Sequence, residues 1–204
     1  MVFSSGVFLI LFLPITTILY FLIPAKYLQV RNIVLLIASL VFYAWGEPIF
    51  VFVMMASVII DWIIGINIES NDKMAKKLMI AAICYHVGLL FCFKYLTFTL
   101  EQVNLLVDIN VVKIELPIGI SFFTFQMMSY IFDVYYKRIS AQKDFYKLAL
   151  YITMFPQLVA GPIVRYQTVA SEINVRSVTV VDFYEGTRRF IIGLSKKVLM
   201  ADQL

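Results

Sequence analysis

Polar side chains that could do chemistry gather in one otherwise apolar region, residues 116–165. In its first half, Gln126, Ser129 and Asp133 are spaced i, i+3 and i+7, so they share one face of a helix. Inside a membrane, each of these groups needs a partner in the protein or in a water-filled cavity. The stripe therefore predicts either the wall of a tunnel or hydrogen bonds between packed helices.

The second half of this region is interrupted by Pro156 and by the pair Gly161 and Pro162. A broken helix leaves backbone amides and carbonyls free, and these can serve a substrate or a neighbouring side chain. Arg165, beyond the break, can hold an anionic group or can act only as a basic anchor beside the membrane. The candidate tunnel residues are therefore Gln126, Ser129, Asp133, Gln157, Gly161, Pro162 and Arg165.

The sequence contains none of the short patterns of known catalytic sites, such as HExxH, CxxC or a glycine-rich phosphate loop. With His86 as the single histidine, the commonest general base is almost absent. Cys84 and Cys92 share its apolar segment, but the three lack the close spacing of zinc ligands. We predict no catalytic residue, no metal ligand and no bound cofactor within these 204 residues.

Composition indicates an integral membrane protein. The chain is 62% hydrophobic and 15% charged, with a mean hydropathy of +0.89, whereas a soluble domain is about 45–50% apolar. The net charge of +4 comes from basic residues between apolar runs, which is typical of residues that set membrane orientation. The expected partner is therefore the lipid bilayer, with no role for nucleic acid.

The elements that must position the polar residues are apolar helices. Expected spans are residues 6–23, 32–45, 49–68, 78–96 and 116–136. Residues 146–164 are expected to form a broken, re-entrant helix. Residues 183–204 are expected to form an amphipathic helix, for which Asp182 with Glu185 resembles a capping box.

One carboxylate lies inside a span. Asp61 falls within residues 49–68, and an intramembrane carboxylate is a candidate functional group. The alternative is that Asp61 sits near one interface and is bonded to a neighbouring helix.

Basic residues also predict the orientation of the chain. The loops after successive spans hold two, zero, three, one and four Lys or Arg residues. Because high counts mark cytoplasmic loops, the alternation places the N-terminus outside the cell membrane. The chain is thus expected to be a multi-pass protein of the cytoplasmic membrane.

Five blocks in order along the chain resemble one known family. They are FSSGVFLILFLPITTILYFL, RNIVLLIASLVFYAWGEP, LPIGISFFTFQMMSYIFDVYY, FPQLVAGPIVRY and EGTRRFIIGLSKKVLMAD. Together they resemble the membrane-bound O-acyltransferase family, in particular its bacterial alginate O-acetyltransferase branch. The D-alanyl transfer protein of teichoic acid synthesis is a more distant likeness.

This resemblance implies an all-α, polytopic membrane enzyme of bacteria with helices around a transmembrane tunnel. It implies transfer of an acyl group, acetyl in this branch, from a cytoplasmic acyl-CoA or acyl carrier. The acceptor would be a hydroxyl of an exported polysaccharide, reached directly or through a partner acetyl-transfer protein. The family's catalytic histidine lies downstream of the last block, and His86 does not match its motif. Residues 1–204 are therefore expected to be the N-terminal part of one acyltransferase domain, inactive alone.

Two other functions fit the residues. A transporter or flippase also uses broken helices and buried polar groups, although residues 1–100 and 101–204 show no internal repeat. A noncatalytic membrane scaffold of a polymer-export complex would need no open cavity beside the polar stripe.

Overall fold

The computed structural model describes residues 3–105, 107, 114–158 and 164–201, and all regular structure in these residues is helical. The α-helices are α1 (Leu13–Leu22), α2 (Leu28–Ala44), α3 (Phe50–Ser70), α4 (Asp72–Leu90), α5 (Leu96–Asn104), α6 (Ile120–Tyr135), α7 (Phe145–Thr153), α8 (Phe155–Leu158), α9 (Tyr166–Asn174) and α10 (Val180–Lys196). Shorter turns are the π-helical Val7–Phe12, Phe91–Tyr95 and Lys197–Ala201 and the 3-10 turn Ala25–Tyr27.

Three helical stretches of the described chain are long and apolar enough to cross a membrane: Ala25–Ala44, Phe50–Ser70 and Asp72–Asn104. Val7–Leu22 is a shorter apolar helix. Large apolar side chains point outward along these stretches, with Ile10 and Phe52 each 74% exposed. An apolar surface of this extent suits lipid and not water, so the expected all-α, polytopic membrane class is confirmed.

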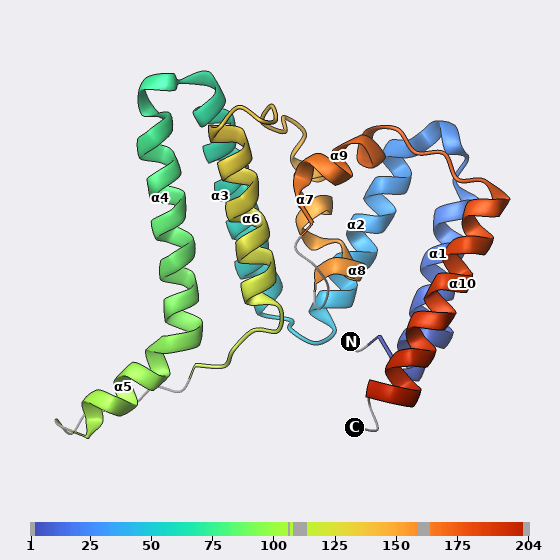
Figure 1. Ribbon diagram of the computed structural model, residues 1–204, viewed down its shortest axis with the longest axis horizontal. Helices are drawn as coiled ribbons and strands as arrows, with labels where there is room; N and C mark the ends of the chain where they lie inside the picture. The colour runs from blue at the N-terminus through green and yellow to red at the C-terminus, as the bar shows by residue number, and fades with distance from the viewer. Residues whose placement is uncertain (1–2, 106, 108–113, 159–163, 202–204) are drawn as a thin grey trace.

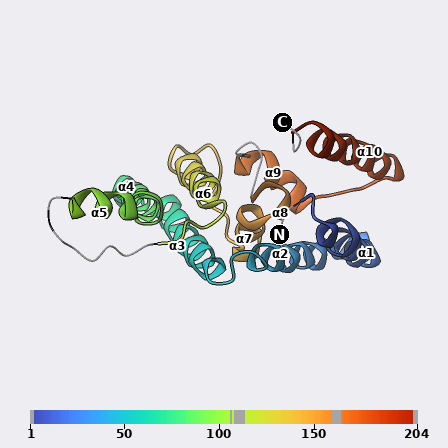
Figure 2. The ribbon, with the colours of Figure 1, turned by 90° about the horizontal axis from the view of Figure 1, so that it is seen from below.

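The helices form a curved row, with α4 and α5 at one end and α1 and α10 at the other (Figures 1 and 2). At the α4 end of the row, helices α3, α4 and α6 pack against one another as a three-helix unit. In the middle of the row, α7 contacts both α3 and α2. The main core lies here, around the fully buried Met54, Met127, Tyr130 and Tyr151. The final helix, α10, contributes no buried residue.

Helix α2 begins at Leu28, whereas the sequence suggested a span from residue 32. The reason is that its polar residues have partners. The Arg31 side chain donates to the carbonyl oxygen of Ile23, and the Asn32 side chain donates to that of Ile173. Helix α6 begins later than residue 116, because Gly119 at its N-cap adopts a left-handed φ of 79°.

The segment 146–164 is broken as expected. Helix α7 ends at Thr153, Met154 takes a non-helical ψ of 114°, and α8 starts at Phe155. The chain then returns to the end from which it came, since Gln142, before α7, hydrogen-bonds with its side chain to the hydroxyl of Tyr166 at the start of α9. Residues 159–163 lie outside the described residues, and the re-entrant course through a membrane stays a prediction.

A close approach between α3 and α6 depends on Gly65. A Cβ at this position would lie 3.0 Å from the hydroxyl oxygen of Tyr130, which is fully buried and cannot move freely. We expect Gly65→Leu to lower the free energy of unfolding by about 1–3 kcal/mol through overpacking. The measurement is thermal unfolding of the purified protein in detergent.

Gly88→Leu on α4 is the matched control for this test, because no atom lies within 4 Å of a Cβ at Gly88. If both variants lowered the unfolding temperature equally, the destabilisation would not come from overpacking between α3 and α6.

The amphipathic helix α10 starts at Val180 with Thr179 as its N-cap, and not at residue 183 with Asp182 as the cap. The Thr179 side chain accepts from the backbone N–H of Asp182, and the Asp182 carboxylate accepts from the Thr179 hydroxyl and N–H. The capping box therefore pairs Thr179 with Asp182, in place of the expected Asp182 with Glu185. A capping box is therefore present, as predicted, but it begins three residues earlier in the sequence than expected.

These hydrogen bonds from Thr179 hold the pKa of the Asp182 carboxyl below its usual value. The cap therefore stabilises α10 above the ordinary carboxyl pKa and is lost as the pH falls through the lowered one. We expect Thr179→Ala to raise the pKa of Asp182 toward its ordinary value, as followed by NMR titration of the carboxyl carbon. Thr187→Ala, on the same helix, should leave that pKa unchanged. An unshifted Asp182 in Thr179→Ala would contradict the cap.

Candidate functional site

A pocket with a mainly apolar lining and a few polar side chains lies on the face of α6 that turns toward the start of α9. Its volume is about 320 Å³. We call it the Asp133 pocket, and it is lined by Phe125, Met128, Ser129, Phe132, Asp133, Tyr136, Arg138 and Arg165. Three of the seven predicted site residues, namely Ser129, Asp133 and Arg165, therefore meet in one cavity, although they come from two different segments.

Asp133 is the buried acid of this pocket. Its side chain is 4% exposed, and its Oδ1 lies 3.4 Å from Nη1 of Arg138, a side chain that is more than half exposed. Its Oδ2 is buried and has no hydrogen-bond partner in the described residues. A buried acceptor without a partner costs free energy, and the cost is removed when a donor approaches it.

Arg165 supplies the opposite charge. It occupies the N-cap position of α9, is exposed, and forms no ion pair in the described part of the chain. A guanidinium group binds carboxylate or phosphate oxygens through paired N–H donors. The Asp133 pocket thus offers an acceptor oxygen and a cationic donor to the same ligand.

Gln126 and Gln157 do not line this pocket. Both side chains donate to the carbonyl oxygen of Tyr151, with an Nε2-to-oxygen distance of 3.1 Å for Gln126. The break after α7 leaves this carbonyl without a helical donor, since the N–H of Phe155 bonds to the Ser39 hydroxyl instead. At these positions the structure shows hydrogen bonds between segments, one of the two alternatives for the polar stripe. Gly161 and Pro162 lie outside the described residues.

Asp61 and His86 form a second buried polar contact, distant in sequence from the stripe. Nε2 of His86 lies 2.8 Å from Oδ2 and 3.1 Å from Oδ1 of Asp61, and the two side chains are 0% and 1% exposed. Asp61 is thus bonded to a neighbouring helix, as one alternative held, but it lies half way along α3 and not near its end. The pairing joins α3 to α4.

Sequence reasoning treated these two residues separately and missed the contact. The available signal was the short connection at Asn71, which makes α3 and α4 an antiparallel pair. Such a pair brings together residues on either side of the turn.

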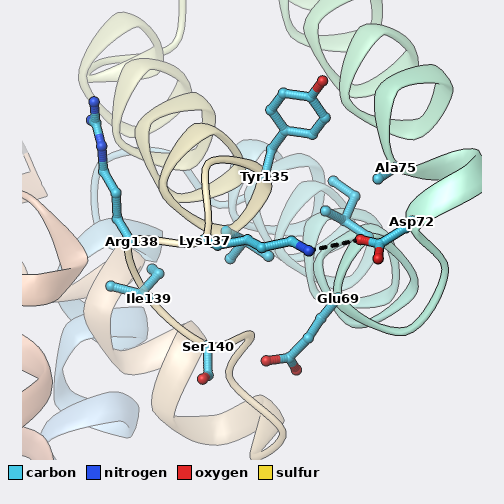
Figure 3. Close-up of a pocket in the computed structure, with 10 residues that line it drawn as sticks. Glu69, Asp72, Ala75, Tyr135, Lys137, Arg138, Ile139 and Ser140 are labelled. Atoms are coloured by element: carbon cyan, nitrogen blue, oxygen red, sulfur yellow. Dashed lines mark ion pairs between the residues drawn. The ribbon is translucent and has the colours of Figure 1, made fainter.

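A separate pocket of about 350 Å³ lies where the α3–α4 turn meets the end of α6 (Figure 3). Lys137 reaches Asp72 with a distance of 3.0 Å between Nζ and Oδ1, and both side chains are about three-quarters exposed. Figure 3 shows Arg138 pointing away from this pair. An exposed ion pair contributes little stability, so we assign this pocket to the surface and not to the site.

Known proteins that match the chain are O-acetylating enzymes by name. The chain is 38% identical, over all of its length, to a protein of Azotobacter vinelandii named "Probable alginate O-acetylase AlgI", of which it covers 42%. It is also 38% identical to the protein of the same name from Pseudomonas aeruginosa, of which it covers 40%. The chain is homologous to the alginate O-acetylases. The resemblance to the alginate branch of the membrane-bound O-acyltransferases is therefore confirmed.

The name of a third relative gives a different polymer as the acetyl acceptor. The "Peptidoglycan O-acetyltransferase" of Helicobacter pylori is 28% identical over 99% of the chain, which covers 45% of it. The chain thus spans less than half the length of the curated relatives it matches. No family model matches the chain, and no solved structure does.

Proposed function

We propose that this chain acts in a membrane-embedded O-acetyltransferase that modifies an exported polysaccharide. The observation that carries the proposal is the 38% identity to alginate O-acetylases along the whole chain. In the reaction, a hydroxyl oxygen attacks the acetyl carbonyl carbon, the bond from that carbon to the donor sulfur breaks, and the hydroxyl proton ends on the released thiol. Residues 1–204 contribute binding surface, and we assign no general base to them.

In this proposal the acetyl donor is a cytoplasmic thioester, either acetyl-CoA or an acetylated carrier protein. Both carry phosphate groups, and both carry amide and hydroxyl groups that can donate hydrogen bonds. The Asp133 pocket suits such a donor, because Arg165 can bind phosphate and the Asp133 carboxylate can accept a hydrogen bond. The acceptor is a polysaccharide hydroxyl, reached directly or through a partner protein that receives the acetyl group.

The proposed location is the cytoplasmic membrane of a bacterium, with the N-terminus outside. Support comes from the placement of basic residues. Arg31 near the start of α2, the lysines at the start of α4 and the basic turn after α6 lie at one end of the bundle, opposite the N-terminus (Figure 1). Under the positive-inside rule this end is cytoplasmic, and the Asp133 pocket lies toward it.

The test is deletion of the gene and its return on a plasmid, followed by measurement of ester-linked acetyl on the secreted polysaccharide. We expect acetyl to be lost on deletion, with polymer yield maintained, and restored by the complete gene. Loss of polymer export would favour the transporter or scaffold. Unchanged acetyl content would contradict the proposal.

A further inference from the structure

Two guanidinium groups share one tyrosine ring where α1, α2 and α9 meet. The Arg31 guanidinium carbon lies 4.8 Å from the centre of the Tyr20 ring, and that of Arg176 lies 5.8 Å from it. Arg176 also donates to the Tyr20 hydroxyl at 3.1 Å and to the side-chain oxygen of Asn32 at 3.3 Å. We call these four residues the Tyr20 cluster.

The Tyr20 cluster carries positive charge without a counterion. Arg31 is 7% exposed and Arg176 is half-buried. Within the described residues, no Asp or Glu oxygen lies within 4.0 Å of either guanidinium group. Both groups bond to uncharged oxygens, which for Arg31 is the carbonyl of Ile23. Buried charge is expensive unless an opposite charge approaches it.

The start of α2 adds to this positive potential. Arg31 lies in the first turn of this 17-residue helix, where the free backbone N–H groups carry partial positive charge. A cation is unfavourable at that end of a helix, and an anion is favourable. Lys26 lies just before the helix, in the turn Ala25–Tyr27. The basic groups of this corner, Lys26, Arg31 and Arg176, therefore favour an anionic ligand.

A separate apolar groove lies along α1 and α2, and none of the four cluster residues lines it. Its volume is about 450 Å³. Among its lining residues are Leu11, Ile15, Leu19, Val34, Ile37 and Ala38. Leu19 adjoins Tyr20 in sequence, and Val34 lies one helical turn beyond Arg31. The groove continues to Trp45 at the far end of α2.

We propose that this corner binds one anionic phospholipid, with its phosphate on the Tyr20 cluster and one acyl chain in the groove. A free anion would use the guanidinium groups but leave the groove empty, and a neutral lipid would leave both arginines without a counterion. A lipid with net negative charge satisfies both features. Arg176 follows the end of α9, so the cluster ties α1 and α2 to the chain just after this helix, and the bound lipid stabilises this packing.

The experiment uses the product of the complete gene in nanodiscs, with native mass spectrometry to count retained lipid. We expect phosphatidylglycerol to be retained over phosphatidylcholine. Charge-assisted hydrogen bonds to phosphate are strong, so Arg176→Gln should weaken retention about tenfold. Arg31→Gln should have the same effect, and Arg189→Gln, an exposed arginine on α10, should have none. Equal retention of both lipids, or an unchanged Arg176→Gln variant, would overturn the proposal.

A second pair of variants keeps the test valid if an arginine variant fails to fold. Ala38→Phe fills the groove without touching the Tyr20 cluster, and it should lower retention of phosphatidylglycerol. Ala81→Phe, on the exposed face of α4, should not. A final measurement compares the unfolding temperature of the protein with inorganic phosphate alone and with phosphatidylglycerol. If inorganic phosphate raises the unfolding temperature as much as phosphatidylglycerol does, the site takes a free anion and the lipid proposal is wrong.

Discussion

Replacing Asp61 by leucine is expected to lower the free energy of unfolding by about 3–5 kcal/mol, because it leaves one member of a buried pair without its partner. His86 is fully buried, and its Nδ1 already lacks a hydrogen-bond partner in the described residues. Without Asp61, its Nε2 loses its contact as well. The measurement is equilibrium unfolding of the purified protein in mixed micelles.

Two further variants make this prediction specific. Asp72→Leu removes an acid from an exposed ion pair, and it should cost less than about 1 kcal/mol. The double variant Asp61→Leu/His86→Leu removes both polar groups and should be more stable than Asp61→Leu alone. If Asp61→Leu were no more damaging than Asp72→Leu, the contact between α3 and α4 would not stabilise the fold.

Changing the Asp133 pocket should reduce acetyl transfer with little effect on stability. Arg165→Gln removes the cation that binds the donor, and Asp133→Asn removes the charged acceptor. Each should lower the acetyl content of the polysaccharide about 10- to 100-fold, the effect of losing a hydrogen bond to a charged group. The assay uses the deletion strain carrying each variant of the complete gene.

Matched controls separate the pocket from general loss of charge. Arg189→Gln and Asp144→Asn change exposed residues outside the pocket, and both should keep full activity. Gln126→Leu should keep most of the activity too, because its partner, the Tyr151 carbonyl, still accepts from Gln157. Full acetylation with Arg165→Gln at a normal protein level would remove Arg165 from donor binding.

The membrane class and the break in residues 146–164 could be predicted from the sequence because both depend on local composition. Long apolar runs leave only a helix as a spanning structure, and Pro156 lies two residues after Met154, where the helix is interrupted. The start of α2 could not be predicted in this way. Its polar first turn is compensated by Ile23 and Ile173, the second of which is far away in the chain.

The candidate site was predictable only as a set of polar residues. Helical spacing placed Gln126, Ser129 and Asp133 on one face, but it could not say which of them meets a cavity. Gln126 does not meet the cavity because the break after α7 leaves the Tyr151 carbonyl without a helical donor, and the Gln126 side chain donates to it instead. Asp133 instead lies beside Arg138, which follows the end of α6.

The most direct test of the central claim asks whether the Asp133 pocket opens to the cytoplasm and admits the acetyl donor. The exposed Cys84 and Cys92 are first replaced by serine, and Ser129→Cys is added in the complete gene product. We predict that a membrane-impermeant maleimide labels Ser129→Cys in inside-out vesicles and not in right-side-out ones, and that acetyl donor slows the labelling. Labelling from the outer face alone, or none until the protein is denatured, would contradict the account.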